Sequence, residues 1–120
     1  MHTNYPKVMQ MLGSMTMVER VLHTAQKITN KITVISGFKA EILEAHINQN
    51  FSQITYCRQE EQLGTAHAVK MGADQITKDE KVLILYGDVP LIKKDTLDAV
   101  INPDGACLLT TSLDLSLIHI

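Results

Sequence analysis

Residues 81–88 read KVLILYGD, an apolar run that ends in a glycine and an aspartate. A short, continuous apolar run of this kind is typical of a β-strand that is buried on both faces of a sheet. Such sheets are parallel and carry helices on both faces, because each connection between parallel strands crosses over the sheet. The stretch therefore predicts an α/β fold, with Gly87 and Asp88 at the carboxyl end of a buried strand.

Two hydrophobic periods alternate along the rest of the chain, as an α/β fold requires. Further strands are predicted at residues 31–36 (KITVIS), 54–58 (ITYCR) and 106–113. Helices are predicted at residues 15–26, with Ser14 as the N-cap, and at 40–48, 66–76 and 93–100. The chain opens with a polar stretch and a helix, so the predicted fold has no opening strand of its own.

The composition narrows the class of protein. A chain of 120 residues fits one domain, and 11 Lys and Arg against 13 Asp and Glu give a net charge of −2 without a basic stripe, which argues against a nucleic-acid partner. The apolar runs are too short for a membrane span and no N-terminal signal precedes them, so no membrane partner is expected. Cys57 and Cys107 form neither a CxxC pair nor a disulfide framework, which favours a reducing cytoplasm.

Ligands of open α/β sheets bind beyond the carboxyl ends of the strands, so the residues that follow each strand are the candidates for a site. Asp88 can hold Mg²⁺, which takes one or two carboxylates together with waters and substrate phosphates; a turn or cap residue is the alternative. The amide of Gln59 can donate to and accept from a base, although Gln59 taken alone is better interpreted as a polar loop residue. Gly64 and Thr65 open a helix, where backbone N–H groups face a ligand or Thr65 acts as a cap. Lys7 can meet a phosphate as a point charge, although a single loop lysine is usually only solvated.

Two other features of the sequence give weaker evidence about function. The glycines form no GxG pattern, so the sequence has neither the dinucleotide-binding fingerprint nor a P-loop. His67 falls in the first turn of a predicted helix, where a structural role is favoured over catalysis.

Three motifs taken together resemble one family: YPKV at residues 5–8, QEEQLGTAHA at 59–68 and LYGDVPL at 85–91. Over residues 1–114 they are similar, in order and spacing, to the uridyltransferase domain of the bacterial bifunctional enzymes that make UDP-N-acetylglucosamine. The resemblance implies a Rossmann-like nucleotidyltransferase fold and a UTP-dependent transferase. The implied reaction moves UMP from UTP to N-acetylglucosamine-1-phosphate and releases pyrophosphate, in the cytoplasm, on the route to peptidoglycan and lipopolysaccharide precursors.

The resemblance also implies a role for each matched residue. Lys7 and Asp88 would be the catalytic pair, with Lys7 on the phosphates of the nucleotide and Asp88 as the Mg²⁺ ligand. The remaining nucleotide and sugar-nucleotide contacts would come from Gln59, which reads uracil, Gly64 and Thr65 beside the base, and Tyr86 and Gly87 together with Asp88.

The sequence also departs from the family. The opening strand with its LAAGxGTRM-type glycine-rich loop, a later Gly-Tyr-Gly-Arg motif and a second metal-ligating Asn have no counterpart in it. Nor has the C-terminal β-helix domain, the acetyltransferase through which full-length relatives form homotrimers. We therefore expect residues 1–114 to be a partial uridyltransferase domain that is inactive alone. Residues 115–120 (LSLIHI) are what CTG TCT CTT ATA CAC ATC encodes, which resembles a transposon-end sequencing adapter, so a non-native tail is expected there.

Two alternatives stay open at this point. Another sugar-1-phosphate nucleotidyltransferase would keep the chemistry and change the sugar or the base. A non-catalytic α/β binding or regulatory domain of flavodoxin-like build would bind no uridine nucleotide and would give Gln59 no role.

Overall fold

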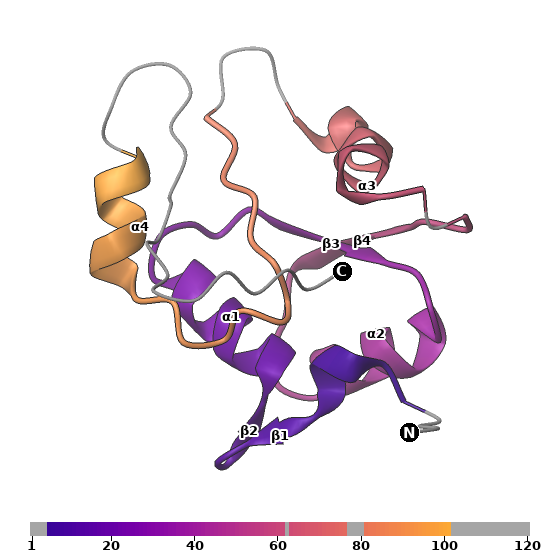
Figure 1. The fold of residues 1–120 in the computed structure, drawn as a ribbon, viewed down its shortest axis with the longest axis horizontal. Helices are drawn as coiled ribbons and strands as arrows, with labels where there is room; N and C mark the ends of the chain where they lie inside the picture. The colour runs from indigo at the N-terminus through magenta and orange to yellow at the C-terminus, as the bar shows by residue number, and fades with distance from the viewer. Residues whose placement is uncertain (1–4, 62, 77–80, 102–120) are drawn as a thin grey trace, which may run out of the picture.

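The computed structural model describes residues 5–61, 63–76 and 81–101. Helices and strands alternate through the middle of the chain (Figure 1). None of the helices in this part of the chain is long and apolar enough to cross a bilayer. In chain order the elements are η1 (Lys7–Met9), β1 (Met11–Leu12), β2 (Met15–Thr16), α1 (Met17–Gln26), β3 (Ile32–Ser36), α2 (Ala40–Asn48), β4 (Ile54–Arg58), α3 (Thr65–Met71), η2 (Ala73–Gln75) and α4 (Lys94–Ile101).

The predicted parallel pairing is confirmed for β3 and β4. The two strands run in the same direction, with Ile32 opposite Ile54 and Ser36 opposite Arg58. Both are rich in β-branched residues, which suit a half-buried pleated surface. Helix α2 connects them, so β3, α2 and β4 form the βαβ unit that the sequence predicts.

Helices cover both faces of this strand pair, as the fold class requires (Figure 1). On one face, α1 and α2 contribute the buried core residues Val18, Leu22, Leu43 and Ile47, with Phe51 just beyond α2. Alternate strand residues pack against that core, because successive side chains of a strand point to opposite faces. On the other face, Gly72 at the end of α3 lies so close to Ile35 that an added Cβ would come within 2.9 Å of its Cδ1 atom.

The beginning of α1 differs from the sequence-based prediction. The N-cap is Thr16, not Ser14, because residues 11–16 form an antiparallel hairpin in which Gly13 turns the chain with a φ of 73°. The Thr16 hydroxyl accepts a hydrogen bond from the Glu19 backbone N–H, and Glu19 Oε1 accepts one from the Thr16 N–H at 3.0 Å. This reciprocal capping box satisfies two backbone donors that the helix itself leaves unpaired.

The prediction of a buried strand at residues 81–86 is wrong for the structure as described. The segment has no strand hydrogen bonds, and every second side chain is about half exposed, namely Val82 (50%), Ile84 (50%) and Tyr86 (53%). The composition of the segment demands burial, but a strand also needs a neighbouring backbone with which to pair. Among the described residues, β3 pairs only with β4, and residues 81–86 line a cavity together with β3 instead of pairing with it.

The remaining helices follow the predictions with small differences. Helix α2 has the predicted bounds, α4 is shifted by one residue, and its Leu97 is buried. Helix α3 is shorter than predicted, because it ends at Met71 and gives way to the 3-10 turn η2. The strand predicted at 106–113 and the tail at 115–120 lie outside the described residues.

Candidate active site

The first part of the site is the carboxyl end of β4. The Gln59 backbone N–H donates to the Ser36 carbonyl oxygen at 2.7 Å, which continues the pairing one residue beyond the strand. Just before it, Arg58 donates from Nε to Glu44 at 2.9 Å and ties the strand end to α2. The hydrogen bond to Glu44, followed by its charge, raises the pKa of the Arg58 guanidinium. The backbone of Gln59 is therefore held in place at the end of the sheet.

The second part is the start of α3. Gly64 is its N-cap, with a φ of 98° that favours glycine, and Thr65 is the first helical residue. The two ends of the loop between β4 and α3 lie close together, because Gln59 Nε2 donates a hydrogen bond to the Gly64 carbonyl oxygen at 3.3 Å. The same Nε2 lies 2.9 Å from Nδ1 of His67, in the first turn of α3. The structure thus brings together the candidate residues Gln59, Gly64 and Thr65.

The third part is the turn after residue 86. Val89 donates its backbone N–H to the Tyr86 carbonyl oxygen at 3.2 Å, which closes a turn over Gly87 and Asp88. The turn packs against η1, because a Cβ added at Gly87 would come within 3.0 Å of Cγ1 of Val8. Glycine at this position therefore allows the close approach of the two segments.

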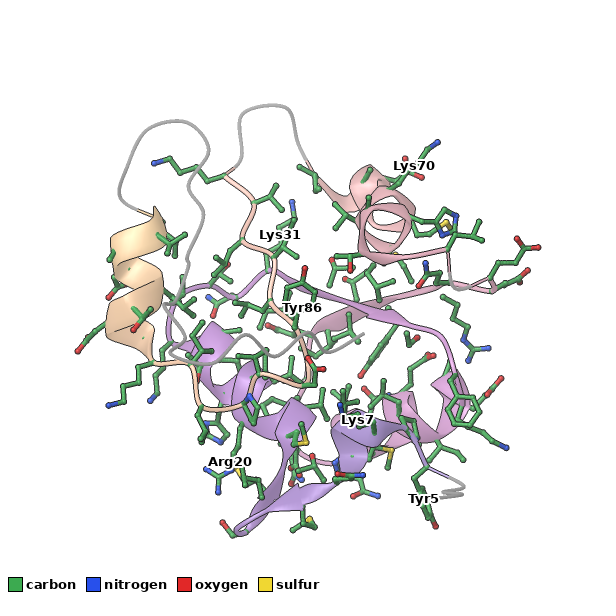
Figure 2. All side chains as sticks on the ribbon, viewed as in Figure 1. Tyr5, Lys7, Arg20, Lys31, Lys70 and Tyr86 are labelled. Atoms are coloured by element: carbon green, nitrogen blue, oxygen red, sulfur yellow. The ribbon has the colours of Figure 1, made fainter. Side chains whose placement is uncertain are left out.

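That packing brings the two predicted catalytic residues together. Nζ of Lys7 lies 3.9 Å from Oδ2 of Asp88, with the two side chains 71% and 47% exposed. The distance is too long for a direct hydrogen bond. Figure 2 shows the Lys7 side chain on η1. An exposed pair of this kind adds at most about 1 kcal/mol to stability, so the contact does not explain the fold.

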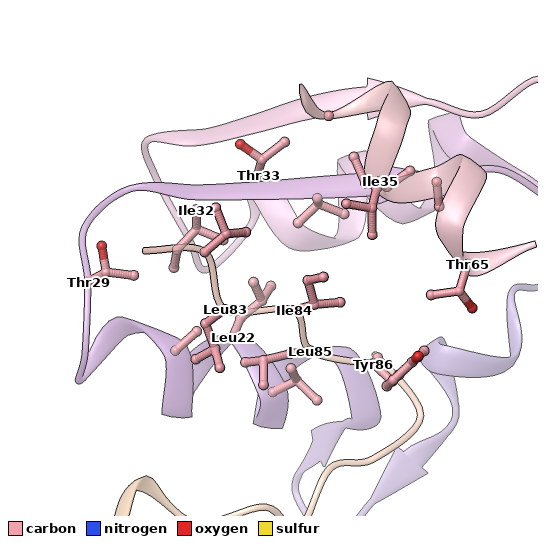
Figure 3. Close-up of a pocket in the computed structure, with 18 of the residues that line it drawn as sticks. Leu22, Thr29, Ile32, Thr33, Ile35, Thr65, Leu83, Ile84, Leu85 and Tyr86 are labelled. Carbon is pink, nitrogen blue, oxygen red and sulfur yellow. The ribbon is translucent and has the colours of Figure 1, made fainter. Parts of the chain in front are cut away.

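A single large cavity connects these parts. It has a volume of about 1350 Å³, and Gln59, Gly64, Thr65, Tyr86 and Gly87 all line it. Figure 3 shows β3 and residues 83–86 running in the same direction on its two sides, with Thr65 and Tyr86 together at one end. The other walls are largely apolar side chains of α1, β3 and residues 82–85. The polar residues therefore form one end of an otherwise apolar space.

This cavity is larger than the 300–1,000 Å³ of a usual small-molecule site. Its apolar part has the character of unfilled core, whereas the polar end is the part that can bind a ligand. We name that end the mouth: Gln59, Gly64, Thr65, Tyr86 and Gly87. Lys7 and Asp88 lie just outside it, each next in sequence to a lining residue, Val8 and Gly87.

The described residues hold no group of three or more His, Cys, Asp or Glu side chains that could bind a metal ion by themselves. Asp88 is half exposed and has no carboxylate partner within such a group, so it could supply one ligand at most. That suits a cation that keeps most of its waters or shares the phosphate oxygens of a substrate, as Mg²⁺ does.

The sequence does not show that His67 contacts a candidate site residue. Its ring supports the Gln59 side chain from outside the mouth, which is compatible with the structural role that the sequence favours. Residues 59 and 67 meet only because the intervening loop folds back on itself. The available signal was the position of His67 in the first turn of a helix that begins beside the candidate residues.

Comparison with known proteins shows which family the chain resembles. Residues 1–111 match the family model described as the MobA-like NTP transferase domain. The chain is also 41% identical over 119 residues to the bifunctional protein GlmU of Psychrobacter cryohalolentis, an alignment that covers 95% of this chain and 26% of that protein. The chain thus spans about a quarter of the length of this curated relative.

Proposed function

The chain belongs to the family of MobA-like NTP transferase domains, and on that premise we propose that it is part of an enzyme that makes UDP-N-acetylglucosamine. The reaction transfers UMP from UTP to N-acetylglucosamine-1-phosphate and releases pyrophosphate. The observation that carries the proposal is the convergence of Gln59, Gly64, Thr65, Tyr86 and Gly87 on one mouth, with Lys7 and Asp88 beside it. The 41% identity to GlmU across nearly the whole chain supports this reaction over that of another sugar-1-phosphate nucleotidyltransferase.

The base would bind at the first two parts of the site. Gln59 is held at the end of β4 and offers an amide to the edge of uracil. Gly64 has no side chain to obstruct a base, and nothing lies within 4 Å of the place where its Cβ would be. Thr65 lines the same space and would lie beside the base.

The phosphates would bind between η1 and the turn after residue 86. The Lys7 ammonium would meet their negative charge, and Tyr86 and Gly87 would contact the sugar nucleotide. A phosphate oxygen of N-acetylglucosamine-1-phosphate attacks the α-phosphorus of UTP while the bond to pyrophosphate breaks. Catalysis of this kind rests on positioning and charge neutralisation rather than on a covalent intermediate.

Enzymes of this type use a divalent metal ion, and we propose Mg²⁺ held by Asp88. The carboxylate of Asp88 fits such an ion because it is exposed and free of a direct hydrogen bond to Lys7. Its Oδ2 atom lies 3.9 Å from Lys7 Nζ, which is too far for one. When bound, the ion neutralises negative charge on the phosphates. The part played by this chain is to hold the carboxylate and the ammonium on neighbouring segments, through the close packing of Gly87 on Val8.

We further propose that the active domain contains one more strand than the residues described here. The cavity lies between β3 and residues 81–86, which run in the same direction (Figure 3). A parallel strand between them would pair with both and cover the apolar walls. This matches the opening strand and phosphate-binding loop that the resemblance implies, with residues 1–114 as a partial uridyltransferase domain.

The proposed reaction also implies the binding partners and the cellular compartment of the protein. UTP and N-acetylglucosamine-1-phosphate are its substrates, and nothing in it calls for a nucleic acid or a membrane. The proposal places the protein in the cytoplasm, where nucleotides are made and used, and assigns it to the supply of cell-wall precursors.

The test uses the gene product that contains these residues at its natural length. We expect Mg²⁺-dependent release of pyrophosphate when UTP and N-acetylglucosamine-1-phosphate are supplied together. Replacing UTP by CTP, dTTP or GTP, or the sugar by glucose-1-phosphate, should lower the rate at least tenfold. A preference for another base or sugar would favour the related transferase, and the absence of uridine nucleotide binding would favour a non-catalytic domain.

A further inference from the structure

The side-chain amide of Gln59 has a fixed orientation in this fold. Its nitrogen Nε2 faces the Gly64 carbonyl oxygen at 3.3 Å, and a carbonyl oxygen can only accept a hydrogen bond. The group nearest to Gly64 must therefore be the NH₂ and not the amide oxygen.

His67 completes that arrangement. Its Nδ1 lies 2.9 Å from the same Nε2 atom. Because Nε2 is a donor, Nδ1 must accept, which requires the neutral ring with its proton on Nε2 of the histidine. The two amide hydrogens then point to two acceptors of the protein, one on the backbone and one on a side chain.

These hydrogen bonds limit which groups of the Gln59 side chain can bind a ligand. With both N–H groups used internally, Gln59 presents only its carbonyl oxygen Oε1, which is an acceptor. We propose that His67 is a positioning residue that fixes the Gln59 amide so that the site selects a base with an N–H donor on its pairing edge. Uracil has such a donor at N3, whereas cytosine has an acceptor there, and two facing acceptors would leave a costly mismatch.

This inference rests on the proposed function, because it concerns how the same site chooses its nucleotide. Without the acceptor on His67, one N–H of the amide has no partner in the protein and can donate to cytosine N3, while the other still faces the Gly64 carbonyl oxygen. His67 does not touch the base in this account. It acts on selection only through Gln59.

The experiment compares three variants in the gene product of natural length. His67→Leu removes the acceptor, and His67→Asn returns one through its side-chain oxygen. Lys70→Gln is the matched control, since Lys70 is exposed on the same helix one turn further along. The measured quantities are kcat and KM for UTP and for CTP, and the KM for N-acetylglucosamine-1-phosphate.

We expect His67→Leu to lower the ratio of kcat/KM for UTP to that for CTP about tenfold, with kcat for saturating UTP within twofold of wild type. That loss corresponds to about 1.4 kcal/mol, the scale of one hydrogen bond. His67→Asn should recover most of the ratio, and Lys70→Gln should not change it. An unchanged ratio in His67→Leu, or an equal loss with both nucleotides that Asn fails to rescue, would overturn the proposal.

A second measurement separates this inference from the proposed function. Nitrogen NMR of the ligand-free wild-type protein should show His67 with its proton on Nε2 and an unprotonated Nδ1. A wild type that turns over no nucleotide would overturn the proposed function and the base selection with it, while this spectrum would still decide the hydrogen bond. A proton on Nδ1 of the neutral ring would disprove the assigned orientation even in a fully active enzyme.

Discussion

Lys7 and Asp88, whose side chains approach to 3.9 Å, owe their proximity to a contact between their sequence neighbours. Gly87 packs against Val8 so closely that no larger residue fits without displacement. The packing that fixes the geometry is therefore separate from the charges that would act on a substrate. This separation lets each charge be removed with little effect on the fold.

The first prediction concerns Asp88 and, like the second and third, applies to the gene product of natural length. Asp88→Ala should abolish Mg²⁺-dependent pyrophosphate release, because the proposed metal ligand is lost. The unfolding midpoint should change little, since an exposed ion pair contributes at most about 1 kcal/mol. Asp98→Ala is the matched control, as Asp98 is also exposed and paired with a lysine, Lys94, but on α4. Near-normal turnover in Asp88→Ala would exclude it as the metal ligand.

The second prediction concerns Gln59. Gln59→Ala should raise the KM for UTP about tenfold or more, because the amide that would read the base is gone. The KM for N-acetylglucosamine-1-phosphate should rise less than threefold. Steady-state kinetics with each substrate varied in turn makes the comparison, and Glu60→Ala is the neighbouring control. Equal losses for both substrates would indicate a damaged loop and not a base-reading residue.

The third prediction concerns the capped N-terminus of α1 and its contribution to stability. Glu19 is 8% exposed; burial by itself raises the pKa of its carboxyl, but hydrogen bonds from Thr16, the nearby His46 and a hydrogen bond from Asn50 together lower it. A lowered pKa in the folded state means that the carboxylate contributes stability above its unfolded pKa, near 4.5. That contribution is lost as the pH falls through the lower, folded value.

Unfolding midpoints measured from pH 7 to pH 3 check this sign. Wild type should lose stability below about pH 4.5. Glu19→Gln should be less stable at pH 7 by about 1–2 kcal/mol, because it loses charged hydrogen bonds, and the gap should close towards pH 3. Asp74→Asn, at an exposed position on η2, should follow the wild-type profile. A gap that stays constant over this range would mean that the charge of Glu19 plays no part.

The elements that sequence predicts well are those whose partners lie close along the chain. β3, α2 and β4 form one βαβ unit, and their periodicities match their observed bounds almost residue for residue. The predicted start of α1 is wrong, although Thr16 and Glu19 have the spacing of a capping box. The hairpin that ends at Thr16 moves the start of the helix past Ser14.

The predictions that fail depend on partners far along the chain. The pattern of residues 81–86 indicates how much burial they need and says nothing about which backbone they pair with. The site shows the same limit. Gln59 and Asp88 could be found because each follows an apolar strand-like run, but the contact between Gln59 and His67 depends on a loop that closes only in three dimensions.

The last prediction concerns the 120-residue chain on its own, which should be inactive and only loosely folded. It has a cavity of about 1350 Å³ beside β3, and Val82, Ile84 and Tyr86 are about half exposed. Apolar surface left in water forfeits about 25 cal/mol per Å², and a domain of this size has only about 5–15 kcal/mol of stability in total. We expect strong binding of a hydrophobic dye, a broad calorimetric transition and no pyrophosphate release from UTP.

Adding an apolar, β-branched segment of six to eight residues at the N-terminus through a flexible linker should sharpen the transition, because it can pair with β3 and fill the cavity. A Gly/Ser segment of equal length should not. A cooperative transition together with measurable turnover in the unmodified chain would contradict the prediction.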